Sequence, residues 1–366
     1  MTTLRWWLLA GLWLVYFSFG LSVSSLAPLV APIEADLNIS HTLMGSIMGA
    51  WQLVYIFAAV PCGILLDKLG GRRALLIGAL LLGVSTAGRA VADDYFSFLF
   101  AVMLFGLGGP IVSSGAPKVV AQLFTGSDRG LAMGIYMTGP AIGGVVSLTL
   151  TNSYLLPWLG DWRAVMWLWA AVSAGAALLW FAVSSVARLD RLDEAGRLGG
   201  EKVSQIQLMR QLISEPAVRI VLLMSVGVFL FNHGLNNWLP ELLFSNGLTL
   251  VAAGYWAALP TVVGVLGSLT IPRLATPDRR FQILLGLCLA ATLASVLLQF
   301  TSGPLLTIGL IMQGIARSSM MTVLILALVE LPGIGERNAG SASGLFFSAA
   351  EVGGMLGPLS MGLIYD

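Results

Sequence analysis

The chain has 366 residues, of which 57% are hydrophobic and 10% are charged, and its formal net charge is +1. Soluble globular proteins carry roughly 25% charged residues, so this composition excludes an ordinary soluble domain and predicts a surface that faces lipid. A net charge near zero, without a basic stripe, also argues against nucleic acid as a partner.

Apolar runs long enough to cross a bilayer follow one another along the chain. A membrane helix needs about 20 predominantly apolar residues. The first run, from Trp6 to Val30, is longer than the apolar core of a signal peptide, so we interpret it as a membrane helix. The run from Phe281 to Ala316 must hold two helices, because a turn signal interrupts it at 301–304. We predict eleven spans, near 6–30, 42–66, 74–92, 95–122, 130–154, 162–186, 218–242, 250–272, 281–300, 304–329 and 338–363.

One long polar segment, 187–217, separates six spans from five. We interpret it as a cytoplasmic linker that lies partly on the membrane surface. The sequence therefore predicts an all-α membrane protein with a six-helix bundle at 1–186 and a five-helix bundle at 218–366.

The distribution of Lys and Arg predicts the orientation of the chain. With a cytoplasmic amino terminus, fifteen of these residues fall on the inner side and only Arg89 and Arg163 on the outer side. The remaining two, Lys118 and Arg317, lie within spans. Because cytoplasmic loops carry the excess of positive charge, we expect this orientation in a bacterial inner membrane.

The two halves share a glycine pattern that indicates a duplicated unit. Four glycines of the first half return at an offset of 210 residues in the second. The four pairs are Gly130 and Gly340, Gly134 and Gly344, Gly143 and Gly353, and Gly144 and Gly354. Pro28 returns as Pro240, and Arg72-Arg73 returns as Arg279-Arg280. Copies with an even number of spans run parallel, as in transporters with a central site between two halves.

The repeat predicts a counterpart of span six near 372–396, beyond Asp366. Two explanations fit this gap. Either a twelfth helix is missing from the sequence, which is the expectation we favour, or the protein has eleven spans.

The segment after span two carries a recognisable motif. It reads Gly63-Ile64-Leu65-Leu66-Asp67-Lys68-Leu69-Gly70-Gly71-Arg72-Arg73. This resembles the signature loop of the major facilitator superfamily, at the position between spans two and three that the family uses. A carboxylate at Asp67 can accept hydrogen bonds from Arg72 or Arg73, which would latch helices together as a cytoplasmic gate. The alternative is a simple positive-inside anchor.

Further segments resemble the same superfamily, and the resemblance covers essentially the whole chain. The stretch Gly134–Gly144 is similar to its antiporter motif, although close helix packing explains these glycines equally well. Pro117-Lys118 and Trp238-Leu239-Pro240 resemble the bacterial cyanate and nitrate/nitrite permease-like branch. The span-four arginine of many proton-coupled drug exporters is absent, which argues against drug–proton exchange.

Arg317 is the strongest candidate for binding a solute. It lies near the centre of span ten, with Gln313 one turn earlier on the same face. A charge at mid-membrane is retained only where a partner or a water-filled cavity compensates its cost. The resemblance implies that spans one, four, seven and ten line a central cavity, where a guanidinium would bind an anion. The alternative is an internal ion pair that holds the bundle together.

Glu351, in the middle of span eleven, is the obvious partner for such a pair. If it pairs with Arg317 it neutralises the site, and if it is unpaired it is a candidate carrier of a coupling proton. Both alternatives remain open on the sequence, as does a role in neither.

Span seven carries a polar stripe. His233, Asn237 and Glu241 are spaced at i, i+4 and i+8, with Asn232 and Asn236 adjacent. So many polar groups on one side of a membrane helix are expected to face a cavity or another helix. His233 titrates near neutrality when unperturbed, so it is a second candidate for proton coupling, or a neutral hydrogen-bonding group.

Lys118 lies near the inner end of span four. Its side chain either reaches the headgroups or helps to guide anions towards the cavity.

Together these features predict a secondary active transporter of a small polar, anionic solute, driven by protons or by exchange. Alternatives are efflux of apolar or drug-like compounds and a non-transporting sensor or scaffold on the same fold. No catalytic motif indicates a membrane enzyme. Cys62 and Cys288 both lie inside apolar runs, so we expect no disulfide, metal or cofactor. We expect a monomer whose partners are the lipid bilayer, the solute and protons.

Overall fold

The computed structural model describes residues 2–124, 126–186, 210, 212–300, 302–329, 331 and 335–366. Most of the predicted linker, 187–209, lies outside the described residues. The chain divides into two compact units, unit 1 (Met1–Glu201) and unit 2 (Lys202–Asp366). Within the described ranges every regular element is a helix, and eleven helices are long and apolar enough to cross a membrane. The eleven predicted spans are therefore confirmed in number.

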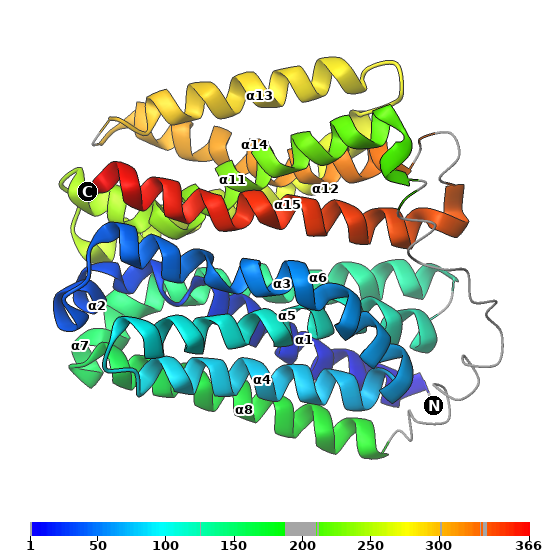
Figure 1. Cartoon of the computed structure of the whole chain (residues 1–366), viewed down its shortest axis with the longest axis horizontal. Coiled ribbons are helices and arrows are strands. Elements are labelled where there is room, and N and C mark those ends of the chain that lie inside the picture. Colours follow the sequence, from blue (N-terminus) through cyan, green and yellow to red (C-terminus); the bar gives the residue numbers. More distant parts are fainter. Residues whose placement is uncertain are drawn as a thin grey trace. The chain divides into compact units, whose positions relative to one another are not determined.

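Unit 1 is a bundle of long helices that run side by side (Figure 1). Its elements are α1 (Thr2–Ser24), η1 (Ala27–Leu29), α2 (Val30–Leu37), α3 (His41–Leu69), α4 (Gly71–Ala90), α5 (Tyr95–Leu123), α6 (Gly126–Leu150), η2 (Thr151–Leu155), α7 (Leu156–Leu159) and α8 (Trp162–Val186). The helix α1 packs along α6, α3 packs along α5, and α4 packs against both α5 and α8.

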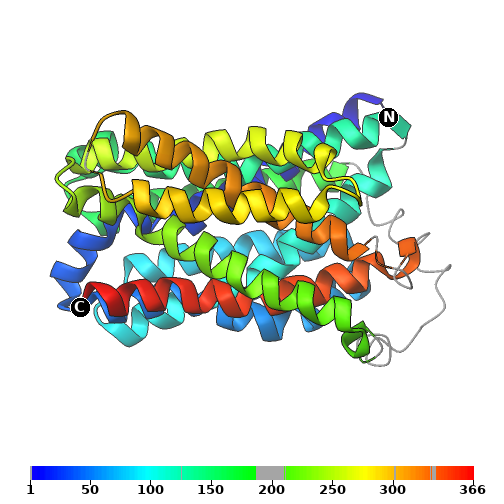
Figure 2. The same cartoon turned by 90° about the horizontal axis from the view of Figure 1, so that it is seen from above.

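Unit 2 repeats this arrangement with five long helices. They are α11 (Pro216–Ser245), α12 (Leu250–Leu274), α13 (Arg280–Leu297), α14 (Pro304–Val329) and α15 (Gly335–Tyr365). The helix α11 packs along α15, and α14 packs against both α12 and α13, which is visible in the yellow and orange ribbons of Figure 2.

Glycines set the closest helix crossings at matching positions of the two units. A Cβ atom on Gly143 would lie 2.1 Å from the carbonyl oxygen of Phe17, and one on Gly353 would lie 1.9 Å from that of Val226. Such separations are possible only without a side chain, so these glycines let α6 approach α1 and α15 approach α11. The paired glycines Gly134 and Gly344, in contrast, have open space around them.

The first span differs from its prediction of one uninterrupted helix. The helix α1 ends at Ser24, a bend and the 3-10 turn η1 follow, and α2 continues the same span to Leu37. The fifth span is also irregular, because the π-helical turn η2 follows α6. Such irregular turns inside membrane helices are frequent at functional sites.

Candidate solute-binding site

Arg317 lies inside unit 2, near the middle of α14, and its side chain is only 8% exposed. Its Nη1 donates a hydrogen bond to Oδ1 of Asn236 on α11 at 2.6 Å. Its Nη2 donates to Oγ1 of Thr261 on α12 at 3.2 Å. Three helices therefore converge on one guanidinium, and both acceptors are neutral side chains.

Close packing of α12 and α14 brings Thr261 to the arginine. A Cβ atom on Gly314 would lie 2.3 Å from the carbonyl oxygen of Pro260, and one on Gly264 would lie 2.3 Å from Oγ of Ser318. Gly314 of α14 thus approaches α12 at Pro260, directly before Thr261, and Gly264 approaches α14 one turn after Thr261. This explains why a short threonine side chain reaches the guanidinium, a contact that sequence reasoning missed.

The predicted alternative of an ion pair between Arg317 and Glu351 is wrong. Neither residue takes part in an ion pair in the part of the chain that the structure describes. Glu351 lies in α15 at 5% exposure, and its Oε2 is buried without a hydrogen-bond partner among those residues. An isolated buried charge is costly, so each of the two groups requires its own compensation.

The polar stripe of α11 divides between two roles. Asn236 binds the arginine, whereas Asn237 is buried and donates from Nδ2 to the backbone carbonyl of His233 at 2.8 Å. The ring of His233 packs against Phe229, with their centroids 5.4 Å apart, and Asn232 is half-buried. Of the five polar residues in the stripe, Asn236 is the one whose hydrogen bond to Arg317 is resolved.

Gln313, one turn before Arg317, is fully enclosed. Both of its side-chain amide atoms are buried without a hydrogen-bond partner in the described ranges. Unpaired buried amides are rare in folded proteins, and such groups mark places where water or a ligand provides the missing bonds. Gln313 therefore stays a candidate beside the arginine.

The predicted cytoplasmic gate is described only in part, because the side chain of Asp67 lies outside the described residues. Arg72 donates from Nη2 to Oγ of Ser185 at 2.6 Å, and its backbone carbonyl accepts a bond from Nε1 of Trp180 at 3.0 Å. Arg72 thus ties α4 to α8, while Arg73 is exposed. Lys118 is half-buried in α5.

Sequence reasoning also missed the environment of Arg89, which the positive-inside count placed on the outer side. Its side chain is 2% exposed and bonds to Ser22, Ser25 and Ser85. Ser85 precedes Arg89 by one helical turn, and Ser22 and Ser25 lie at the end of α1. A polar face on both helices was the signal that pointed to this contact.

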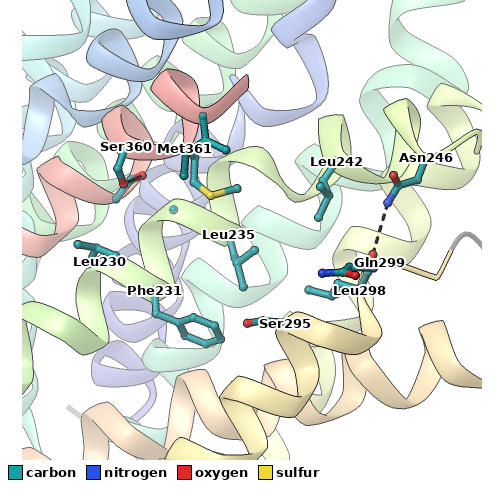
Figure 3. Close-up of a pocket in the computed structure, with 13 residues that line it drawn as sticks. Leu230, Phe231, Leu235, Leu242, Asn246, Ser295, Leu298, Gln299, Ser360 and Met361 are labelled. Atoms are coloured by element: carbon teal, nitrogen blue, oxygen red, sulfur yellow. Dashed lines mark hydrogen bonds between the residues drawn. The ribbon is translucent and has the colours of Figure 1, made fainter. Parts of the chain in front are cut away.

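A pocket of about 520 Å³ opens elsewhere in unit 2, between α11, the end of α13 and α15 (Figure 3). Leu235, Leu298 and Met361 give it a largely apolar lining. Neither Arg317 nor Asn236 lines it. In unit 1 the corresponding face, on α1 and α4, is covered by α8. The largely apolar lining and the absence of charged side chains from it among the described residues do not suit a small charged solute.

The sequence as a whole matches the family model described as Major Facilitator Superfamily, over residues 12–358. The chain belongs to this superfamily. The predicted family and fold are thereby confirmed, and the protein is a multi-pass membrane transporter.

Two curated relatives of this superfamily member are bacterial transporters. The uncharacterized transporter YycB of Bacillus subtilis (strain 168) is 24% identical over 98% of this chain and 87% of its own length. The hexuronate transporter of the same organism is 22% identical over 91% of this chain and 82% of its own length.

A solved structure shares the fold. It is that of a bacterial homolog of the human lysosomal transporter Spinster, in an inward-facing and unoccupied conformation. The TM-score is 0.77 at 15% identity, over 99% of this chain and 83% of that one. At this identity the likeness supports the architecture alone.

Proposed function

We propose that this superfamily member is a secondary active transporter of a small anionic solute, which it binds at Arg317 and moves by alternating access. The observation that carries the proposal is a buried guanidinium whose resolved acceptors, Asn236 and Thr261, are both neutral. A membrane protein retains such a charge where an anion or water compensates it.

The geometry of the arginine suits an anion. A guanidinium has five N–H donors in a planar fork, and Asn236 and Thr261 each use one of them. These two bonds come from different helices and fix the plane of the group. The remaining donors suit the two oxygens of a carboxylate or the planar nitrate ion.

The nature of the anion follows from the same chemistry. Sugar acids, which carry a carboxylate, are one candidate class, and the hexuronate transporter among the relatives supports it. Nitrate and cyanate are a second class, in keeping with the resemblance of Pro117-Lys118 and Trp238-Leu239-Pro240 to permeases for those ions. Gln313 and His233 lie on the two helices that supply Arg317 and Asn236, and they are the next residues to test for contact with the solute.

Glu351 is the group that we assign to proton coupling. It lies on α15, is buried, and has no ion-pair partner in the described part of the chain. Binding of a proton would neutralise the charge of its carboxylate. A cycle in which Glu351 gains and loses a proton as the cavity opens to either side would couple solute movement to a pH gradient. Exchange of one anion for another is the alternative source of driving force.

Two further groups keep their predicted roles in this proposal. Asp67, Arg72 and Arg73 form a gate between helices on the cytoplasmic side, with the amino terminus in the cytoplasm. Lys118 adds a positive charge on α5 that attracts anions. Substitution of Lys118 by Gln would lower the rate of uptake and its dependence on ionic strength if this role is correct.

The test is uptake into proteoliposomes of purified protein, with glucuronate, galactonate, nitrate and cyanate, each with and without an imposed pH gradient. Wild type is compared with Arg317→Gln and with Arg219→Gln, which removes an exposed arginine of α11 as a matched control. We expect one class of anion to be taken up by wild type and by the control, and not by Arg317→Gln.

Other outcomes would point to the alternatives. Uptake of a drug-like cation that persists in Arg317→Gln would support efflux of apolar compounds. Absence of transport of every compound in the panel, together with regulated binding, would support a sensor or scaffold.

A further inference from the structure

The first span of unit 1 is broken, and its counterpart in unit 2 is not. The helix α1 ends at Ser24, and the chain bends before η1 and α2. Pro28 lies in η1, whereas its counterpart Pro240 lies inside the continuous helix α11. A proline at the same place of the repeat therefore does not by itself cause the break, and a second feature of unit 1 must stabilise it.

Arg89 of α4 supplies that feature from one side. Its Nη1 donates to the backbone carbonyl of Ser22 at 2.9 Å and to Oγ of Ser25 at 3.2 Å. Its Nη2 donates to Oγ of Ser85 on its own helix at 3.3 Å. The last carbonyls of a helix lack partners within the helix and carry its negative partial charge, which favours a cation there. Arg89 thus caps the carboxyl end of α1 from a neighbouring helix.

Asn152 holds the break from the other side. Its Nδ2 donates to the backbone carbonyl of Pro28 at 2.9 Å, from within the π-helical turn η2. The 207-residue offset between Arg72-Arg73 and Arg279-Arg280 makes Val296 the counterpart of Arg89, and the 210-residue offset of the paired glycines makes Gly362 the counterpart of Asn152. Neither Val296 nor Gly362 has a side-chain hydrogen-bond donor. Val296 is 51% exposed. Both ties are therefore specific to unit 1, the unit with the broken helix.

The far end of α2 is held by weaker, more exposed contacts. Glu34 pairs with Nδ1 of His41 at 2.7 Å, and Asp36 pairs with Arg163 at the start of α8. Exposed ion pairs contribute little to stability. The eight-residue helix α2 is joined to α1 through a short turn, and its apolar side chains Val30 and Ile33 are buried inside unit 1.

We propose that residues 25–29 form a hinge in the first span and that Arg89 is the positioning residue that keeps α2 seated, with Asn152 as the second tie. When the two ties break, α2 moves as a gate at its end of unit 1. The proposal adds a conformational step to transport, yet it depends neither on the identity of the solute nor on the role assigned to Arg317.

Hydrogen–deuterium exchange of the full chain in lipid nanodiscs tests the hinge without any solute. The variants are Arg89→Gln, Arg89→Lys and Asn152→Ala, and the amides to compare are those of residues 26–38. The matched reference is the segment 238–246, which contains the counterpart proline in unit 2. We expect Arg89→Gln to raise exchange in 26–38 about tenfold, because a charged hydrogen bond to a helix end is lost.

The other variants separate positioning from general stability. Arg89→Lys retains a cation near the carbonyl of Ser22 and should restore most of the protection, while Asn152→Ala should raise exchange in 26–38 by a smaller factor. In each variant the exchange of 238–246 and of α6 should match wild type.

Two results would overturn the hinge. One is wild-type exchange of 26–38 in both Arg89→Gln and Asn152→Ala. The other is an equal rise throughout unit 1, which would make the ties ordinary contributors to folding. If Arg89→Gln does not fold, Asn152→Ala and Arg89→Lys decide by the same two criteria. The exchange rates measured in these variants test the hinge whether or not Arg317→Gln still takes up an anion.

Discussion

Arg89 in unit 1 and Arg317 in unit 2 are both buried arginines, and neither has an acidic partner among the described residues. They differ in what accepts their hydrogen bonds. Arg89 faces the carboxyl end of α1, whose carbonyls and partial charge compensate it within the protein. Arg317 lies in mid-helix, and among the described residues its hydrogen-bond acceptors are a neutral amide and a neutral hydroxyl. A buried cation that faces a helix end therefore organises the fold, whereas one without such compensation is suited to an external anion.

The largest effect is expected from Arg317→Gln. Loss of a charged, forked hydrogen-bond donor to the solute should lower uptake of the transported anion by about 100-fold, in line with roughly 1.5–3 kcal/mol for hydrogen bonds to charged groups. The thermal midpoint should stay at or above that of wild type, because a costly buried charge is removed. Uptake kinetics and a thermal melt of the same preparation check both parts, and a lowered midpoint with unchanged uptake would reverse the assignment.

The next largest effects are expected from Gly143→Ala and Gly353→Ala. These substitutions test whether the helices of the two units pack equally closely, although the buried arginines of the units have different roles. In each case the new Cβ would meet a backbone carbonyl oxygen, at 2.1 Å for Gly143 and 1.9 Å for Gly353. We expect each substitution to destabilise the protein by about 1–3 kcal/mol through overpacking. Gly134→Ala and Gly344→Ala, where nothing lies within 4 Å, are the controls and should melt as wild type does.

Arg89→Gln should have the opposite pattern from Arg317→Gln. Removal of its bonds to Ser22 and Ser25 should lower the local stability of the turn after α1 by about 1–3 kcal/mol, measured as faster amide exchange of residues 26–38. The concentration of anion that gives half-maximal uptake should not change, since Arg89 is enclosed by α1 and α4. A large rise in that concentration without loss of stability would place Arg89 in the binding site instead.

Glu351→Gln should affect coupling more than binding. The variant cannot release a proton at this position, so stimulation of uptake by an imposed pH gradient should disappear while counterflow of the same anion continues. Proteoliposome assays with and without the gradient measure the difference. Stimulation equal to that of wild type would remove Glu351 from the coupling mechanism and favour exchange.

The smallest effect concerns Asp94, which caps α5 outside the membrane-spanning segment. Its Oδ1 accepts a hydrogen bond from the backbone N–H of Ser97 at 2.8 Å, and this bond lowers the pKa of the carboxyl below its usual value. A group with a lowered pKa stabilises the fold above the unfolded value, near 3.9, and loses this contribution as pH falls through the folded value. Asp94→Asn keeps a neutral cap, so its thermal midpoint should fall less than that of wild type between about pH 5 and pH 3.

Much of the fold was predictable because the bilayer imposes a strong constraint on sequence. Apolar runs of about 20 residues have few alternatives to membrane helices, so the number of spans followed from the positions of these runs and from the turn signal at 301–304. The repeat was also visible in sequence, but the glycine pairs did not contribute equally. Gly143 and Gly353 form backbone contacts, whereas Gly134 and Gly344 face open space. Sequence shows that a glycine is present and does not show what approaches it.

The site was predictable in its residues and less so in its contacts. Arg317 and Asn236 were both recognised, because polar side chains at mid-membrane are rare. Their hydrogen bond, the contribution of Thr261 and the separation of Glu351 from the arginine depend on helix rotation, which a periodic apolar sequence defines loosely. Arg89 was misjudged for another reason: it lies close enough to the end of α4 to count as a loop charge, and only the packing of α1 against α4 shows that it is enclosed.

The most direct test of the central claim is the thermal stabilisation of purified protein by the anions of the uptake panel, because a ligand that binds only the folded state raises its stability in proportion to the logarithm of its concentration. The account predicts that one class of anion raises the melting temperature of wild type, of Arg89→Lys and of Arg219→Gln to the same extent, and leaves that of Arg317→Gln unchanged. An equal rise in Arg317→Gln would contradict it.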